Sequence, residues 1–337
     1  MVRWKLVQPF WHAARSTGYG RALDIAARDI YGIERVEGES LRELDRRFQD
    51  ARSQGNHYRR VLREKSRMSV SIVDATADVD EDYFVAVQRL DGFIMPAHRS
   101  AVVGTEKHLG MKIHSIRDWK TAMELQLDQA LGQGIVGLKS GLAYMRSLRY
   151  DKVTEADAEA AWNVLFADEN SPDWRAGIKI GKPLQDHMMH HLLSLADTRG
   201  LTVQFHTGIQ EGNGNVVYDS NPLLLTNLLL EYRNVRFDIF HMGYPWTQEV
   251  SVLAKNFQNV YIDMCWGHII SPVAARRALV EWLDAVPANK ISAFGGDYAF
   301  VDGVYGHQYL ARRNVAAALA EKVEDGTVDI SRAQEIA

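Results

Sequence analysis

The sequence of 337 residues has few cysteines and prolines and no long apolar runs. A single cysteine, Cys265, excludes an internal disulfide framework and is typical of a reducing compartment, so we expect a cytoplasmic protein. No apolar run approaches the ~20 residues of a transmembrane helix, and residues 1–10 lack the sustained apolar core of a signal peptide. The sequence therefore predicts no membrane partner.

An excess of charge of one sign is also missing. The 39 basic and 43 acidic side chains give a formal net charge of −4, which predicts no nucleic-acid partner. Glycines are frequent in residues 132–141, but their spacing matches neither phosphate-loop motif. With 46% hydrophobic residues, the chain can bury the core of a large α/β domain.

The sequence pattern of the first part of the chain, residues 1–67, predicts a helical subdomain or insertion. Apolar residues recur at helical spacing in Tyr19–Tyr31, and Leu41–Ala51 and Tyr58–Lys65 are similar. No strand is expected before Ser69.

From there to the end, residues 68–337 alternate short apolar runs with amphipathic segments. This alternation is typical of parallel βαβ units. The predicted strands are Ser69–Asp74, Gly92–Pro96, Ile135–Lys139, Leu201–His206, Val235–His241, Val260–Cys265 and Ile291–Asp297.

Helix caps support the same alternation. Thr154 with Asp157 forms a predicted capping box, and Gly200 is a predicted helix stop before the next strand. Asn221-Pro222 and Ser271-Pro272 each place a cap residue before a proline suited to a first helical turn.

Seven strands fit either a (β/α)8 TIM barrel that lacks one strand or an open, doubly wound sheet. Metal-capable or reactive side chains close four of the runs: His206, His241, Cys265 and Asp297. In a barrel the carboxyl ends of all strands meet at one mouth, whereas distant strands of an open sheet cannot share a site. We therefore favour the barrel and keep the open sheet, with an unrelated site, as an alternative.

Three short motifs carry the predicted chemistry: Phe205-His206-Thr207-Gly208, Phe240-His241-Met242-Gly243 and Gly295-Gly296-Asp297-Tyr298. Each places a glycine near a His or Asp at the end of a run. Neutral imidazoles and a carboxylate are good ligands for a divalent metal ion, Zn²⁺ first and Mn²⁺ second. Such an ion activates water, and a neighbouring aspartate can act as the general base.

These motifs, with Pro245-Trp246 and Asn259-Val260-Tyr261-Ile262-Asp263, resemble the amidohydrolase superfamily in its amidohydrolase-related (family 2) branch. The long helical lead and Gly18-Tyr19-Gly20 are similar to the glucuronate-isomerase-like members. The resemblance implies that His206 is the strand-five metal ligand and that His241 binds metal or substrate from strand six. It also implies that Asp297 is the strand-eight metal ligand and proton shuttle.

Members of this superfamily carry a His-x-His pair at the end of strand one, and this sequence has none. We interpret the sequence as incomplete at both ends, with strand one upstream, and the chain as inactive if that strand is required. The alternative is a barrel that has lost metal binding.

Several further side chains are predicted to bind substrate. Lys139, at the end of strand four, is expected to contact a substrate carboxylate. Arg99, which follows the expected strand three, and Arg146, in the loop after Lys139, are weighed equally against surface roles. Trp246 is expected to form a wall of the pocket, with the packing of a loop onto the barrel as the alternative. A histidine cluster, His187, His190 and His191, is expected to be structural because its helix lies outside the barrel.

The sequence thus predicts a metal-dependent hydrolase that acts on a small polar, carboxylate- or sugar-acid-like substrate, with Asp297 and His241 as catalytic residues. A decarboxylase or uronate-isomerase-like activity on the same scaffold, and a non-catalytic barrel that serves as a binding protein, remain alternatives. Homo-oligomer formation stays open.

Overall fold

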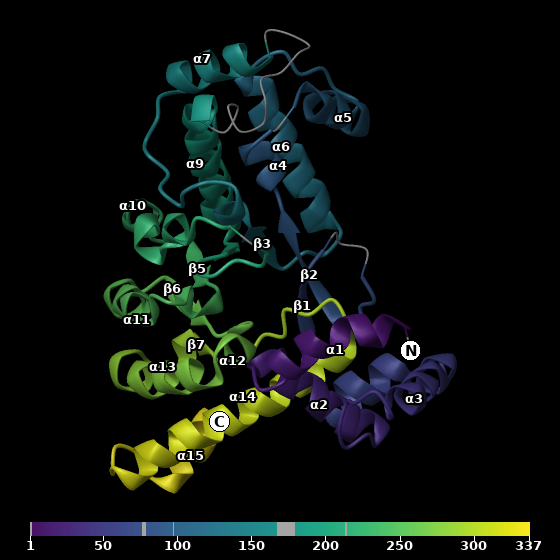
Figure 1. Ribbon diagram of the computed structural model, residues 1–337. Helices are drawn as coiled ribbons and strands as arrows, with labels where there is room; N and C mark the ends of the chain where they lie inside the picture. Colours follow the sequence, from purple (N-terminus) through teal and green to yellow (C-terminus); the bar gives the residue numbers. More distant parts are fainter. Residues whose placement is uncertain (1, 76–78, 97, 167–178, 213) are drawn as a thin grey trace. The chain divides into compact units, whose positions relative to one another are not determined.

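The computed structural model describes residues 2–75, 79–96, 98–166, 179–212 and 214–337. Figure 1 shows how strands and helices alternate along most of the chain. The described residues contain seven strands: β1 Ser71–Asp74, β2 Phe84–Arg89, β3 Gly137–Ser140, β4 Thr202–Phe205, β5 Arg236–Ile239, β6 Val260–Asp263 and β7 Ile291–Ser292.

The strands follow one another across a seven-stranded sheet in the order of the sequence, and every pair from β1 to β6 is parallel. A doubly wound sheet reverses its strand order at a switch point, and this sheet has no such reversal. The architecture is therefore that of a (β/α)8 TIM barrel, here with seven strands as a half-barrel. The open-sheet alternative is wrong.

Helices connect the strands as a barrel requires. Within the described residues, those between β2 and β6 are α4 Asp91–Ile94, α5 Arg99–Leu109, α6 Ile116–Gly132, α7 Glu155–Phe166, α9 Lys182–Arg199, α10 Thr226–Glu231 and α11 Thr247–Asn256. Those after β6 are α12 Gly267–Ile270, α13 Pro272–Ala285, α14 Val301–Glu324 and α15 Ile330–Ile336. Short 3-10 turns fill the loops: η2 Leu142–Tyr144, η3 Val217–Ser220, η4 Pro222–Leu225, η5 His241–Gly243 and η6 Ala288–Lys290.

One predicted strand is wrong. Residues 92–96 fall in α4 and the turn that follows it, and the strand at this place is β2. A short apolar run cannot by itself distinguish a strand from a buried helical turn. Here Phe93 and Ile94 are buried from a helix, and the carbonyl of Phe93 accepts a hydrogen bond of 2.8 Å from the Trp119 indole.

The predicted caps are confirmed. Thr154 and Asp157 bond each other ahead of α7, and the side chain of Ser271 accepts a hydrogen bond from Ala274 N at the start of α13. Gly200 ends α9 with a φ of 65°, a conformation that costs glycine little.

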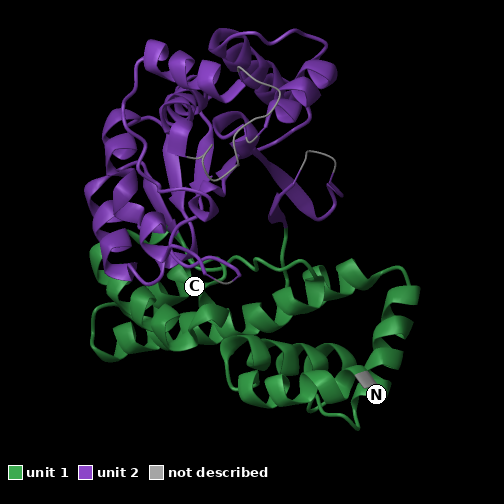
Figure 2. Ribbon diagram, turned by 45° about the horizontal axis from the view of Figure 1, so that its top comes forward, with its two compact units in different colours: residues 1–69, 263–337 green, residues 70–262 purple. Residues whose placement is uncertain are grey.

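The chain divides into two compact units, coloured separately in Figure 2. Unit 1 comprises Met1–Ser69 and Asp263–Ala337, and unit 2 comprises Val70–Ile262. The predicted division into residues 1–67 and 68–337 stays a prediction.

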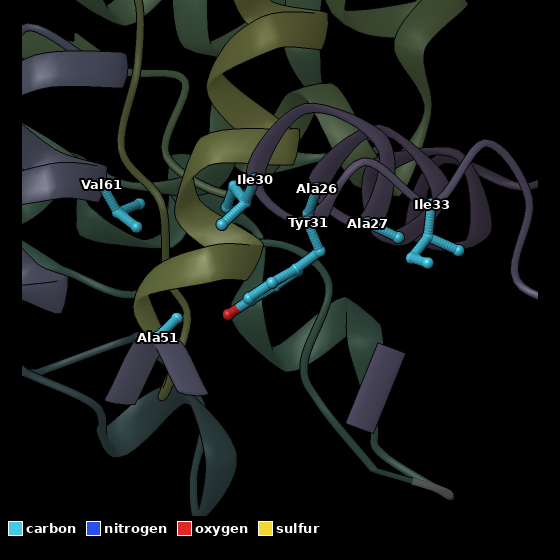
Figure 3. Packing of buried hydrophobic residues seen from close by; sticks show 7 residues of the cluster. All are labelled: Ala26, Ala27, Ile30, Tyr31, Ile33, Ala51 and Val61. Atoms are coloured by element: carbon cyan, nitrogen blue, oxygen red, sulfur yellow. The ribbon is translucent and has the colours of Figure 1, made fainter. Parts of the chain in front are cut away.

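Unit 1 is mainly helical. Its N-terminal helices are α1 Val2–Ala14, α2 Gly18–Tyr31, α3 Leu41–Ser53 and the π-helix η1 Arg59–Lys65. Figure 3 shows its hydrophobic cluster: Ala26, Ala27, Ile30, Tyr31, Ile33, Ala51 and Val61. Asp302, in the first turn of α14, accepts hydrogen bonds from Tyr31 (2.9 Å) and His57 (3.0 Å), which joins α14 to the N-terminal helices.

The described residues of unit 2 contain β1–β5, nearly all of β6 and helices α4–α7 and α9–α11. The two faces of its sheet differ in polarity. One set of aligned side chains is apolar and at most 1% exposed: Leu138, Val203, Phe237 and Val260. This is the face that the helices of a barrel cover.

Among the described residues, no helix has the length and apolar character needed to cross a membrane.

Candidate functional site

Two histidines meet at the carboxyl end of the sheet in unit 2. His206 directly follows β4, and His241 lies two residues after β5. The Nε2 atom of His241 is 2.9 Å from Nδ1 of His206, and the ring centroids are 4.3 Å apart. Both side chains are buried, with exposed fractions of 4% and 1%. The predicted convergence of these two strand ends is therefore observed within unit 2.

The environment of His206 keeps its imidazole neutral. Burial, and next the positive charge of Lys139, lower the pKa of His206 to about 3. Its Nε2–H donates a hydrogen bond of 2.9 Å to the carbonyl of Ile209. In a neutral ring the other nitrogen then has no proton, so the lone pair of Nδ1 points toward His241. A neutral ring with a fixed tautomer is what a metal ligand requires.

The spacing of the two nitrogens fits a shared ion. Two imidazole nitrogens bound to one tetrahedral Zn²⁺ at 2.0–2.1 Å lie roughly 3.3 Å apart. The 2.9 Å between His241 Nε2 and His206 Nδ1 is slightly shorter, as a direct hydrogen bond requires. Small rotations of the two rings would open this edge for an ion.

The backbone around His241 is strained. His241, Met242 and Gly243 have φ values of 65°, 58° and 57°, all in the left-handed region. For residues other than glycine this conformation costs about 1–3 kcal/mol each, and it clusters at functional sites. Gly208, with φ of 72°, allows close approach, since a Cβ there would lie 2.4 Å from the carbonyl oxygen of Tyr244.

Tyr144 stands beside the histidine pair. Its ring centroid is 4.5 Å from that of His206, and its hydroxyl accepts a hydrogen bond of 3.1 Å from Glu211 N. Lys139, at the end of β3, is 4% exposed, and its ammonium lies 3.2 Å from the centroid of the Phe240 ring. The structure thus brings Lys139 and Tyr144 to the same strand ends as the histidines.

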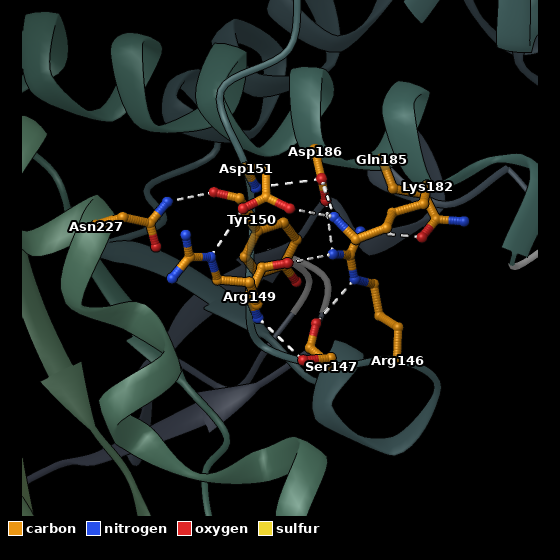
Figure 4. Close-up of polar contacts among 9 residues, drawn as sticks. All are labelled: Arg146, Ser147, Arg149, Tyr150, Asp151, Lys182, Gln185, Asp186 and Asn227. Atoms are coloured by element: carbon orange, nitrogen blue, oxygen red, sulfur yellow. Dashed lines mark hydrogen bonds and ion pairs between the residues drawn. The ribbon is translucent and has the colours of Figure 1, made fainter.

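The contacts of Arg146 are not with the histidine pair. It bonds Asp186 (2.6 Å), Gln185 (3.0 Å) and the carbonyl of Arg149 (2.7 Å), and its guanidinium lies 4.1 Å from the Tyr150 ring centroid (Figure 4). The side chain is 4% exposed. Because these contacts occupy its donors, we assign Arg146 a structural role in place of substrate binding.

Arg99 is also displaced from the predicted position. It begins α5 instead of following a strand, its side chain is exposed, and it donates a hydrogen bond of 3.2 Å to the carbonyl of Phe166. The cause is the misassigned strand at residues 92–96. Arg89, which ends the true strand β2, occupies the position that had been expected for Arg99.

Trp246 precedes α11 as its N-cap residue and is partly buried, and its backbone N–H donates a hydrogen bond of 2.8 Å to the carbonyl of Gly243. Of the rejected histidine cluster, His190 is buried, and its Nδ1 lies 2.9 Å from the Tyr232 hydroxyl, a structural contact.

Asp297 lies in unit 1. It was expected to end a strand, but β7 stops at Ser292 and Asp297 follows five residues later. Its φ of 50° places it in the left-handed region, and its side chain is exposed. Two buried imidazoles bond the backbone just before it: His268 reaches the carbonyl of Ala293 (2.8 Å), and His307 reaches that of Gly296 (3.0 Å).

Sequence reasoning missed the polar residues on the inner strand faces. Gln204 and Asp238 lie within apolar runs and are joined by a hydrogen bond of 3.1 Å. A polar residue inside a strand expected to be buried on both faces was the signal that could have revealed them.

A family model of amidohydrolases matches residues 45–328, most of the chain. The chain belongs to the amidohydrolase family. A curated relative of this amidohydrolase is the protein fluG of Emericella nidulans, 28% identical over 228 residues. That match covers 62% of this chain and 25% of fluG, so the chain spans about a quarter of the length of that relative.

Solved structures share the fold. Glucuronate isomerase from Caulobacter crescentus has a TM-score of 0.76 at 17% identity, over 98% of this chain and 74% of that one. Uronate isomerase from Thermotoga maritima also has a TM-score of 0.76, at 15% identity, over 94% of this chain and 75% of that one. The expected membership of the amidohydrolase family is confirmed by the family match, and the two isomerases share the fold of this chain.

Proposed function

We propose that this chain is the catalytic domain of a metal-dependent amidohydrolase that acts on a small polar carboxylate or sugar acid. The observation that carries the proposal is the buried pair of His206 and His241, whose nitrogens lie 2.9 Å apart. A divalent ion, Zn²⁺ first and Mn²⁺ second, would be held by these two imidazoles and the carboxylate of Asp297. The place of Asp297 in this set rests on the family pattern alone.

The metal, when bound, would polarise the substrate carbonyl and lower the pKa of water at the site toward ~7. Asp297 would accept the proton of the attacking water as that water's oxygen bonds to the carbonyl carbon. The same proton would pass to the leaving group as its bond to that carbon breaks. Lys139 would hold the substrate carboxylate, and Tyr144 and Trp246 would limit access of bulk water.

A second candidate is isomerisation of a uronate. The folds of glucuronate and uronate isomerases match nearly the whole chain, which favours it. In that reaction the same acid–base groups would move a proton from C2 to C1 of the opened sugar and a second proton from the C2 hydroxyl to the C1 carbonyl oxygen, with no bond to water. Decarboxylation and a non-catalytic binding role are left as weaker alternatives, because only the family's breadth and the missing His-x-His pair speak for them.

Turnover separates the candidates. The zinc-loaded protein is assayed with D-glucuronate, followed as ketose formation, and with lactones and amides of small dicarboxylic acids, followed as acid release. The matched variants are Lys139→Met, which keeps length and loses charge, and Lys152→Met on the surface. We expect Lys139→Met to raise KM at least tenfold and Lys152→Met to leave it unchanged. Absence of both activities in a metal-loaded protein would contradict catalysis on these substrates.

A further inference from the structure

One row of side chains crosses the sheet of unit 2 on the face opposite the apolar row. The register aligns these residues of β2 to β6, in order: Arg89, Lys139, Gln204, Asp238 and Tyr261. Because side chains alternate between the two faces of a strand, all five point to the same face. Every member of the row has a polar group, whereas barrel interiors are mostly filled by branched aliphatic side chains.

This polar row is buried at its centre. Lys139 is 4% exposed and Gln204 7%. The Oδ2 atom of Asp238 accepts a hydrogen bond of 3.1 Å from Gln204, while its Oδ1 is shielded from solvent and has no hydrogen-bond partner within the described residues. Burying a carboxylate with an unsatisfied oxygen destabilises a fold, so such groups concentrate where a ligand completes them.

The row lies next to the histidine pair. His206 follows Gln204 by two residues and Phe240 follows Asp238 by two, so they occupy the next layer of the same face, about 6.6 Å along the strands. The ammonium of Lys139 reaches into that layer, where it lies 3.2 Å from the Phe240 ring centroid. A ligand that contacts Lys139 at the strand ends therefore has Asp238 below it, two strands away.

We propose that Asp238 is a substrate-binding residue whose Oδ1 accepts a hydrogen bond from a hydroxyl group of a small hydroxy acid. Gln204 positions the carboxylate by holding its other oxygen, and Lys139 takes the acid group of the same ligand. This inference rests on the proposed function, because it places the ligand at the histidine pair. It adds the hydroxyl as the group that the site selects.

The ionisation of Asp238 agrees with this role. Burial raises the pKa of Asp238 to about 6, against the lowering effects of Gln204 and Lys139. At neutral pH the carboxylate is therefore mostly ionised, and a charged acceptor makes a stronger hydrogen bond with a hydroxyl than a neutral one does.

The test is calorimetric titration of the zinc-loaded protein with D-gluconate and with hexanoate, a matched acid that has no hydroxyl groups. The variants are Asp238→Leu, which keeps the shape of the side chain and loses both oxygens, and Asp238→Asn. The control is Asp128→Asn on α6, which neutralises a carboxyl of unit 2 whose side chain is 53% exposed and pairs with Arg199.

We expect the wild type to bind gluconate at least about tenfold more tightly than hexanoate, the size of one charged hydrogen bond. Asp238→Leu abolishes this preference by weakening the binding of gluconate alone, Asp238→Asn reduces the preference, and Asp128→Asn keeps it. Melting temperatures show that each variant is folded, and if Asp238→Leu is not, Asp238→Asn decides.

A wild type without preference, or a folded Asp238 variant that retains it, overturns the proposal. Elemental analysis of the same samples distinguishes a failure of the proposed metal site from a failure of the role assigned to Asp238. A protein that holds no zinc and still prefers gluconate ends the metal proposal and leaves the assignment of Asp238 in place.

Discussion

The residues of the proposed site combine low solvent exposure with unusual ionisation. His206 is neutral because burial and Lys139 disfavour its charge, and Asp238 holds its proton to a higher pH than an ordinary aspartate. Both shifts arise mainly from desolvation, which always penalises the charged form. Desolvation therefore keeps the His206 imidazole neutral, as a metal ligand must be, and makes the charged form of Asp238 less favourable.

Asp238 should make stability depend on pH. Its folded pKa of about 6 lies above the ordinary value of 3.8, so the folded state binds the proton more tightly than the unfolded chain does. The resulting stabilisation is fully present below pH ~4 and is lost as the pH rises through ~6; by linkage it is on the order of 2–3 kcal/mol.

Chemical denaturation at pH 5.5 and 8 measures this effect. Because other groups also titrate, the comparison is between the wild type and Asp238→Asn. We expect the wild type to lose on the order of 1 kcal/mol more stability than the variant between these two pH values. Equal losses of stability in both proteins would show that folding does not raise the pKa of Asp238.

Some of the site could be predicted from single residues. His206 and His241 close clear apolar runs, and the structure places them together. Gln204 and Asp238 were missed because their contact depends on strand register, which the sequence does not reveal directly. The contacts of Arg146 could not be predicted, because Gln185 and Asp186 are distant from it in sequence and lie on a helix.

At the level of elements, a buried ion pair fixes the loop after β3. Arg146 and Asp186 are 2.6 Å apart with side chains 4% and 1% exposed, and Asp186 also contacts Lys182. This pair joins the loop that carries Tyr144 to α9.

Removing one partner should be costly. Asp186→Ala leaves a buried guanidinium without its counter-charge, and we expect a loss of about 3–5 kcal/mol in unfolding free energy. The control is Asp151→Ala in the same network. Lys182 and Arg149 lower the pKa of Asp151 to about 2, but its side chain is 48% exposed, so solvent screens the pair and the loss should stay below about 1 kcal/mol. Equal losses in a urea titration would contradict the buried-pair account.

A helix crossing in unit 1 depends on one glycine. A Cβ at Gly306 of α14 would lie 2.0 Å from the carbonyl oxygen of Ala22 in α2. Gly306→Ala should therefore destabilise the protein by about 1–3 kcal/mol, since backbone atoms must move apart. In α5, Gly104→Ala meets open space and should stabilise by about 0.5–1 kcal/mol. A thermal melt of both variants measures the contrast, and a neutral Gly306→Ala would show that the helices can separate without cost.

The elements themselves were largely predictable. Tyr19–Tyr31 and Leu41–Ala51 are helices, and the predicted strand starts of β3 to β7 agree with the structure within two residues. The exceptions are residues 92–96 and β7. Residues 92–96 are too short a run to separate strand from helix. Strand β7 has only two residues, although the Gly295 carbonyl beyond its end still accepts a hydrogen bond of 3.0 Å from Trp266 N.

At the scale of the whole molecule, the chain joins a helical unit to a sheet-bearing one. The family match, from residue 45 to residue 328, crosses both boundaries between the units, so the amidohydrolase fold is a property of the whole chain. The strand order could be anticipated from the alternation of runs and helices. The division into units could not, because it depends on contacts between residues 1–69 and residues 263–337, which are distant in sequence.

The measurement that tests the central claim most directly is metal content by elemental analysis of the purified protein, with His206→Ala and His187→Ala as a matched pair. His187 lies on α9, where its Nδ1 is 3.3 Å from the carbonyl oxygen of Val153. The account predicts about one equivalent of Zn or Mn in the wild type and in His187→Ala, and a clear loss in His206→Ala. A wild type without bound metal, or an unchanged content in His206→Ala, would contradict the assignment of His206 and His241 as a metal site.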